Sequence, residues 1–195
     1  MMNMKMQTIL LVGCLAALPL FTGCGKLKDA FNREESVPEL AFSSEAYRVI
    51  PQVSETSSAD GYYSFSETDT INYYKLEGLS DDFNKKYDKS CIKSVTCQSA
   101  TICLTAHTPG NATVHLRNLK ISVEGIAPFL IPTYTFGETY TTEAATSFLE
   151  KLIMQTVKLD QVIITLSGET DYADEMDIQL QGHLEKAVFQ VDLVQ

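Results

Sequence analysis

The chain has 195 residues, of which 15 are basic and 25 are acidic, so its formal net charge is −10 at pH 7. A charge of this sign argues against binding to nucleic acid and against peripheral attraction to anionic lipid head groups, since both reward positive charge. One domain is the natural count for this length, and its core is large enough to be stable without disulfides or metals.

The first 24 residues have a distinctive order. A single lysine, Lys5, precedes an uncharged and largely apolar run over residues 8–20, and small residues then lead to Cys24. The run suits the apolar region of a signal peptide and is shorter than the roughly 20 residues that cross a bilayer as a helix. Residues 21–24, Phe-Thr-Gly-Cys, resemble the lipobox of bacterial lipoproteins. The resemblance implies cleavage after Gly23, a diacylglyceryl thioether on Cys24 and acylation of the new amino terminus.

Two alternatives to this interpretation stay open. Residues 11–14, Leu-Val-Gly-Cys, form a rival lipobox, although only ten residues precede it. The other alternative is a plain secretory signal with Cys24 unmodified. An Asp directly after the lipid-attached cysteine would resemble an inner-membrane retention signal. Position 25 is Gly rather than Asp, which indicates the outer membrane. Residues 25–28 lack an acidic run, which favours the periplasmic face over the cell surface.

These observations predict three segments. Residues 1–23 are expected to be the lipoprotein signal peptide, residues 24–39 a polar tether, and residues 40–195 a single domain resembling a β-sandwich. The membrane is then a partner through the N-terminal lipid anchor. The mature chain would keep 14 basic and 25 acidic residues, for a net charge of −11.

The first half of the domain is rich in strand patterns. Residues 40–50 predict a first strand, residues 62–74 one or two short aromatic strands, and residues 80–87 a short helix. Residues 91–106 predict a long strand with a bulge near Lys93-Ser94, and residues 114–123 continue with a one-residue slip near Asn118. The Pro-Gly turn at 109–110 indicates that these two strands form a hairpin.

The second half contains the strongest helical pattern. Pro128, Pro132 and Gly137 predict a loop. Apolar residues then recur at helical spacing over about 142–157, with Thr141 or Thr142 as the cap. Strands are expected at 162–166, at 176–180 and at 188–194. The predicted fold is mainly β (α+β): a two-sheet β-sandwich of about 7–9 strands with one amphipathic helix packed on it.

Three cysteines recur every six residues at Cys91, Cys97 and Cys103. Six extended residues span about 20 Å, whereas a disulfide needs Cα atoms within about 7 Å. Unpaired thiols are therefore expected, although a turn near residues 98–99 would allow a bridge between Cys97 and Cys103. The predicted hairpin register also places His115 opposite Cys103. Such a pair could bind a metal or act as a nucleophile, but a zinc site needs three or four ligands.

Two further groups are candidate binding sites. Aromatic residues near loops could stack on sugar rings or anchor a protein partner: Tyr62, Tyr63, Phe65, Tyr73 and Tyr74, with Tyr134, Phe136 and Tyr140 further on. The absence of tryptophan weakens the sugar-binding version. Asp171, Asp174 and Asp177 are weak calcium candidates, because their spacing lacks the alternate ligands and closing glutamate of a known calcium loop.

No motif for a serine hydrolase, a phosphate-binding loop or a zinc protease occurs in the sequence. We therefore expect no cofactor and no enzymatic activity. The leading hypothesis is a lipid-anchored cell-envelope protein whose β domain binds an envelope macromolecule or takes part in an assembly. The alternatives are capture of a glycan or apolar ligand, and a hydrolase with an unfamiliar motif.

Overall fold

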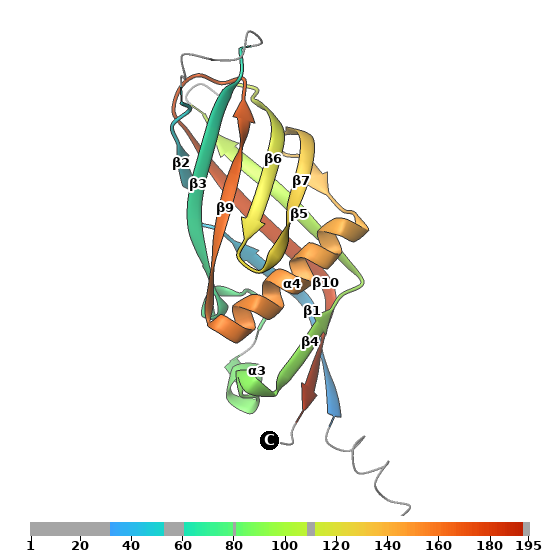
Figure 1. Cartoon of the computed structure of the whole chain (residues 1–195). Helices are drawn as coiled ribbons and strands as arrows, with labels where there is room; N and C mark the ends of the chain where they lie inside the picture. Colours follow the sequence, from blue (N-terminus) through green and yellow to red (C-terminus); the bar gives the residue numbers. More distant parts are fainter. Residues whose placement is uncertain (1–31, 53–60, 80, 109–111, 193–195) are drawn as a thin grey trace, which may run out of the picture.

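The computed structural model describes residues 32–52, 61–79, 81–108 and 112–192. Two antiparallel sheets face each other, and one long helix lies across them (Figure 1). The predicted fold class, a two-sheet sandwich with one helix, is confirmed.

The first sheet, sheet A, is built around the long strand β10, Met176–Asp192. On one side, β10 pairs with β1 (Asn32–Ser43) and then with the short β2 (Tyr47–Val49). On its other side, β10 pairs with β4 (Ile92–Thr96) and β5 (Ser99–His107), and β5 also pairs with β8 (Thr139–Tyr140). This strand is thus the shared backbone partner for most of sheet A.

The second sheet, sheet B, has four strands in the order β3, β9, β6 and β7. Their bounds are Tyr63–Asn72 for β3, Gln161–Thr170 for β9, His115–Val123 for β6 and Ile126–Thr135 for β7. Three short helices follow β3: η2 (Tyr73–Lys75), α3 (Asp81–Lys86) and η3 (Lys89–Cys91). The helix predicted for residues 80–87 is therefore confirmed as α3.

The helix predicted for residues 142–157 is confirmed as α4, Glu143–Leu159. The Thr142 hydroxyl accepts the backbone N–H of Ala145 at 3.1 Å, which satisfies one of the donors left open at a helix start. The apolar stripe is buried and packs against strands of both sheets. It consists of Ala145, Phe148, Leu149, Leu152, Ile153 and Val157.

The predicted tether over residues 24–39 is wrong from Asn32 onward. β1 begins there and pairs with β10 along its length, from Asn32 opposite Asp192 to Ser43 opposite Gln181. Val37 and Leu40 are buried in the core. Their neighbours in the strand are exposed and mostly polar, so the segment looks like a spacer in the sequence: Arg33, Glu34, Ser36, Pro38 and Glu39. Residues 24–31 of the predicted tether lie outside the described residues.

The predicted hairpin between residues 91–106 and 114–123 is also wrong. The first run is two strands, β4 and β5, which break at Cys97 and both pair with β10 in sheet A. The second run, β6, lies in sheet B between β7 and β9. When the chain crosses from one sheet to the other, the apolar faces of both strands still point into the same core, as they do in a hairpin. The apolar pattern therefore could not distinguish the two arrangements.

The loop predicted around Pro128 and Pro132 is instead strand β7. A proline lacks a backbone N–H and is tolerated in an edge strand, where one row of backbone groups has no ladder partner. β7 is an edge strand of sheet B, which explains why two prolines fit there.

Both predicted irregularities are confirmed. Ile92 lies opposite Val191 and Ser94 opposite Gln190, so Lys93 is the extra residue in β4. The register between β6 and β9 shifts between Arg117 and Lys120. Asn118 adopts a φ of 53° at that position, which an asparagine tolerates better than most residues.

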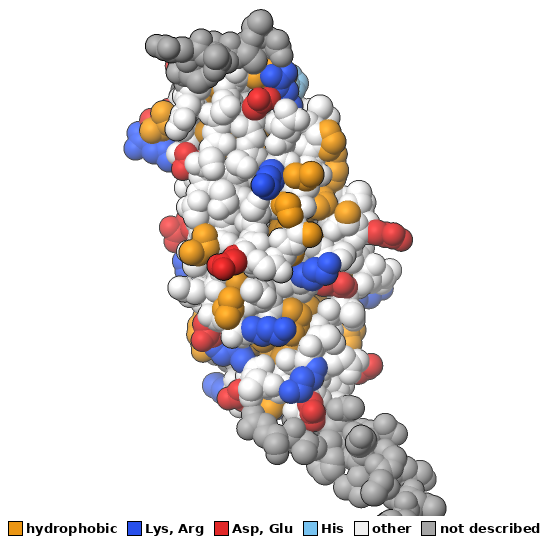
Figure 2. Space-filling model, viewed as in Figure 1, with side chains coloured by type: hydrophobic (Ala, Val, Ile, Leu, Met, Phe, Trp, Pro, Cys, Tyr) orange, Lys and Arg blue, Asp and Glu red, His pale blue; other side chains and the backbone are white. Residues whose placement is uncertain are grey.

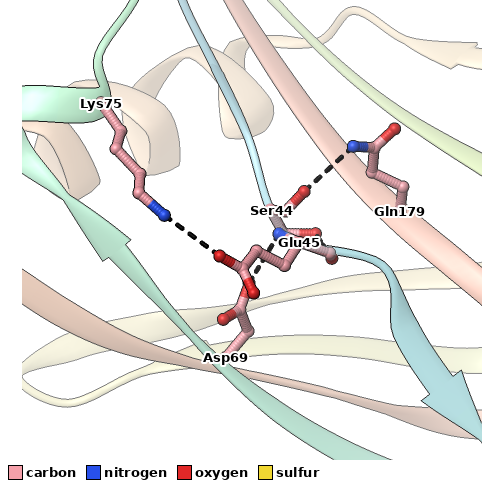
Figure 3. Close-up of polar contacts among 5 residues, drawn as sticks. All are labelled: Ser44, Glu45, Asp69, Lys75 and Gln179. Carbon is pink, nitrogen blue, oxygen red and sulfur yellow. Dashed lines mark hydrogen bonds and ion pairs between the residues drawn. The ribbon is translucent and has the colours of Figure 1, made fainter.

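The two sheets are joined at one seam by a polar network around buried Ser44 (Figure 3). Its hydroxyl accepts the N–H of Leu180 at 3.0 Å, and its carbonyl accepts the side-chain amide of Gln179 at 3.0 Å. The next residue, Glu45, donates its backbone N–H to Asp69 of β3 at 2.9 Å. This network ties the junction of β1 and β2 to both β10 and sheet B.

The other seam is held by Tyr134, which is buried in β7. Its hydroxyl accepts the N–H of Leu104 in β5 at 2.7 Å and donates to the carbonyl of Glu138. The phenol therefore links sheet B to sheet A with both its donor and an acceptor site in use.

Candidate functional site

The aromatic residues singled out in the sequence do not form one surface. Phe65 and Tyr73 are core residues with 4% and 2% of their surface exposed. Tyr62 and Tyr63 lie at the start of β3, whereas Tyr73 and Tyr74 follow its end. Nine strand residues lie between Tyr63 and Tyr73, so these two residues are about 33 Å apart along the strand. A shared stacking platform of these residues is therefore excluded by the fold.

Cations lie next to three rings of the aromatic group, although Tyr74 remains 70% exposed. The guanidinium of Arg117 lies 4.0 Å from the centre of the Tyr62 ring. The ammonium of Lys89 lies 4.7 Å from the centre of the Tyr74 ring and 5.0 Å from that of Tyr73. Burial raises the pKa of the Tyr73 hydroxyl to about 12, so this phenol stays protonated at neutral pH. Tyr134 holds a seam, and Phe136 and Tyr140 pack beside it.

The predicted pairing of Cys103 with His115 does not exist. Cys103 lies in β5 opposite Gln181 and Thr139, while His115 lies in β6 opposite Thr135. The two residues thus belong to different sheets, which removes the candidate nucleophile or metal pair.

The three cysteines of the described chain are all thiols, as the spacing argument predicted. Burial, followed by the nearby Glu150 carboxylate, raises the pKa of the Cys97 thiol to about 11. A thiol with a raised pKa is a poor nucleophile at neutral pH.

The acidic residues near β10 are separated by their partners. Asp171 accepts the backbone N–H of His115 at 2.8 Å. Glu175 accepts a hydrogen bond from Arg48 Nη2 at 2.8 Å, and this pairing lowers the pKa of the Glu175 carboxyl. Asp177 lies within β10 opposite His107, and Asp174 precedes that strand. Within the part of the chain that the structure describes, no three His, Cys, Asp or Glu residues gather as metal ligands would. The calcium hypothesis for Asp171, Asp174 and Asp177 has no geometric support.

The most distinctive surface is the outer face of sheet B, which we call the hydroxyl face. Register places outward-facing residues of neighbouring strands directly opposite one another, as in the pairs Ser66–Ser167 and Thr68–Thr165. The Oγ1 atoms of Thr68 and Thr165 are 3.3 Å apart. Nine hydroxyl side chains share this face: Ser64, Ser66, Thr68, Thr70, Ser122, Thr133, Thr135, Thr165 and Ser167.

The hydroxyl face carries little charge for so acidic a protein. Among the described outward-facing residues of the four strands, Glu169 is the one acid, and Arg117 binds it from the neighbouring strand. Lys120 adds one positive charge. Figure 2 shows this face as largely free of charged side chains over its upper part, with charges more frequent below.

Two large apolar side chains project from the same surface. Ile163 of β9 is 60% exposed and Leu130 of β7 is 62% exposed. Hydroxyls beside exposed aliphatic groups make a flat surface that costs little to desolvate and can form hydrogen bonds in either sense. Such a surface is suited to binding another macromolecule.

A hollow of about 410 Å³ lies beside the first two turns of α4. Its walls are hydroxyl, amide and carboxylate groups from the helix and from the break between β4 and β5. Glu150 in this hollow already accepts the backbone N–H of Cys97 at 2.9 Å. Glu150 therefore helps hold the helix against sheet A.

No known protein-family model matches the chain, and no curated protein matches it. Among the residues that the structure describes, no helix is both long and apolar enough to span a bilayer. Cys24 of the lipobox lies outside the described residues, so its modification stays a prediction.

Sequence reasoning missed the hydroxyl face, although the sequence contains a signal for it. Residues 64–70, Ser-Phe-Ser-Glu-Thr-Asp-Thr, place a hydroxyl at every second position. In a strand, such residues share one face. The aromatic residues beside this run led to the prediction of a stacking site instead.

Proposed function

We propose that the protein is a lipid-anchored component of the bacterial cell envelope whose β domain is non-catalytic and binds another macromolecule through the hydroxyl face. The lipobox at residues 21–24 supports the anchor. The proposed location is the outer membrane, with the domain facing the periplasm.

The observation that carries the binding role is the contrast between the hydroxyl face and the rest of the chain. The chain has a net charge of −10, yet the outward residues of sheet B include one acid, and Arg117 neutralises it. Ile163 and Leu130 are exposed on the same face. Low charge together with exposed aliphatic groups is the composition of the central part of protein interfaces.

Site-specific photocrosslinking in the native cell tests this proposal. A photoreactive phenylalanine at Ile163 should give a discrete adduct with one envelope partner. The same residue at Ser43, exposed at the end of β1 in sheet A, should give none. Thr68→Glu should abolish the adduct at Ile163 by placing a charge on the face, whereas Ser43→Glu should not. Equal adducts at both positions, or no adduct at Ile163, would refute the binding role.

Glycan capture is the alternative within the same class of binding proteins. Sugar binding usually relies on an aromatic platform in addition to hydroxyl groups. None of the described outward-facing side chains of β3, β9, β6 and β7 is a Phe, Tyr or Trp, which favours a protein partner. An Ile163 adduct that a glycosidase returns to the mobility of the uncrosslinked protein, and that contains no peptides of a second protein, would reverse that preference.

A further inference from the structure

One end of the molecule, here called the anchor end, is formed by the start of β1, the end of β10, β4, the short helices α3 and η3, and the end of α4 that lies beside β4. Asn32 pairs with Asp192 there, and α3 lies at the same end (Figure 1). Seven residues separate Cys24 from Asn32 in the sequence, and they span at most about 25 Å when fully extended. A lipid on Cys24 would therefore hold this end close to the bilayer.

The charges of the protein are distributed unequally between this end and the rest. Among the described residues, 32–37, 81–96, 157–160 and 188–192 together contain six basic and seven acidic residues, for a net charge of −1. The other described residues contain six basic and 15 acidic residues, for a net charge of −9. An anionic membrane surface repels the remainder strongly and the anchor end hardly at all.

Lysines at the anchor end also surround a hollow of about 450 Å³ between β4 and the end of α4. Lys89, Lys93 and Lys158 line it, above the buried side chains of Ile92 and Val157. Lys89 pairs with Asp160, whereas Lys93 and Lys158 are exposed. The hollow has room for a phosphate group, and ammonium groups are suited to bind one.

We infer that the anchor end faces the bilayer and contacts the phosphates of anionic lipid head groups through Lys85, Lys93 and Lys158, which holds the long axis of the domain upright. This inference rests on the proposed lipid anchor at Cys24. The anchor supplies the attachment, while the unequal charge decides which end of the domain faces the membrane. In this orientation the hydroxyl face is turned sideways rather than toward the bilayer, so it is accessible to a partner.

The absence of tryptophan from the chain allows a direct test of this orientation. The acylated protein, extracted from cells and placed in vesicles of phosphatidylcholine and phosphatidylglycerol, would carry one tryptophan as the probe. One variant, Ser36→Trp, places the probe in β1 at the anchor end. The other, Thr113→Trp, places it just before β6 at the opposite end. Both positions are exposed. A nitroxide on the lipid head group should quench the probe at Ser36 at least twofold more than the probe at Thr113. Equal quenching, or stronger quenching at Thr113, would overturn the orientation.

Charge reversal then tests the part played by the lysines. Lys85→Glu with Lys93→Glu should reduce the difference in quenching by at least half in anionic vesicles and leave it unchanged in pure phosphatidylcholine. The matched variant, Lys120→Glu with Lys151→Glu, removes the same charge elsewhere and should change nothing. An undiminished difference in the first variant would refute the lipid-phosphate contact.

Failure of the anchor and failure of the orientation can be distinguished by flotation. A wild-type protein that does not float with the vesicles refutes the lipid anchor and the orientation that depends on it. A protein that floats but shows equal quenching of the two probes refutes the orientation alone.

Discussion

The hydroxyl face and the anchor end are stabilised in different ways. The hydroxyl face rests on the packing of sheet B against sheet A, and its outward side chains form few contacts with one another beyond the Thr68–Thr165 and Arg117–Glu169 pairs. The anchor end depends on aromatic packing and ion pairs. Phe83 of α3 lies 5.1 Å from Phe189 of β10, measured between ring centres.

The anchor end also contains a hydrogen-bonded carboxylate. Glu35 accepts the hydroxyl of Tyr87 and the ammonium of Lys86, the latter at 2.9 Å, and Arg33 binds it as well. Side chains of the anchor end therefore support one another, whereas those of the hydroxyl face remain available to a partner. Substitutions should accordingly change stability at the anchor end and binding at the hydroxyl face.

The largest effect is expected for Phe189→Ala. Phe189 is fully buried and joins β10 to α3, so its removal should leave a cavity and lower the free energy of unfolding by about 3–5 kcal/mol. Thr68→Ala on the hydroxyl face should change it by less than about 0.5 kcal/mol. Urea unfolding followed by circular dichroism measures both. Similar losses in the two variants would remove the contrast between the regions.

The two seams that join the sheets provide a second comparison. Tyr134 uses its hydroxyl fully, whereas the hydroxyl of Tyr47 is buried with no hydrogen-bond partner among the described residues. Tyr134→Phe leaves the Leu104 N–H unsatisfied and should lower the free energy of unfolding by about 1–3 kcal/mol.

Tyr47→Phe removes a polar group that has no partner, so it should leave stability unchanged or increase it by up to about 1 kcal/mol. Thermal unfolding of the two variants side by side is the measurement. A loss for Tyr47→Phe as large as that for Tyr134→Phe would show that the Tyr47 hydroxyl is satisfied in solution.

A smaller effect, dependent on pH, is expected at Glu35. The hydrogen bond from Tyr87, followed by that from Lys86, lowers the pKa of this carboxyl below its ordinary value of 4.5. A group whose pKa is lower in the folded state stabilises the fold above its unfolded pKa, and that stabilisation disappears as the pH falls through the folded pKa.

Glu35→Gln should therefore cost up to about 1 kcal/mol at pH 7 and progressively less below pH 4.5. Urea unfolding at a series of pH values measures the difference. Glu34→Gln, one residue away and more exposed, is the control and should show a weaker dependence on pH. A cost for Glu35→Gln that is constant down to pH 3 would contradict the assignment.

The smallest change is expected at Cys97, where the neighbouring Glu150 contributes to a pKa of about 11. Glu150→Gln retains an acceptor for the Cys97 N–H and removes the charge. The thiol pKa should fall while remaining above 9.0, because burial is the larger cause of the shift. Alkylation at pH 8, followed by peptide mass spectrometry, should be several times faster at Cys97 in the variant and unchanged at Cys103. An unchanged rate at Cys97 would assign the shift to burial alone.

Periodicity in the sequence predicted the elements that depend on local pattern. The stripe of α4, the bulge at Lys93 and the slip at Asn118 all follow from the spacing of apolar residues. The pairing of β5 and β6 could not be predicted, because a hairpin and a crossing between sheets bury the same side chains. The strand around Pro128 was missed because a strand tolerates proline when it lies at the edge of a sheet. Which strand lies at the edge is known only from the assembled sheet.

The candidate site was less predictable than the fold. Aromatic residues attracted the interpretation because of their chemistry, yet Phe65 and Tyr73 are core residues and Tyr62 is covered by Arg117. The hydroxyl face depends on four strands that lie far apart in the sequence. Its alternating serines and threonines were visible in β3, but the matching residues of β9 could be recognised only from their register.

The proposed anchor and the proposed orientation both depend on a lipid at Cys24, and labelling with a palmitate analogue tests for that lipid directly. Wild-type cells should give a labelled protein, and Cys24→Ala should abolish the label. Cys14→Ala, which alters the rival lipobox, should leave the label intact. Equal labelling of wild type and Cys24→Ala, or loss of the label in Cys14→Ala alone, would contradict the proposed anchor and the orientation that follows from it.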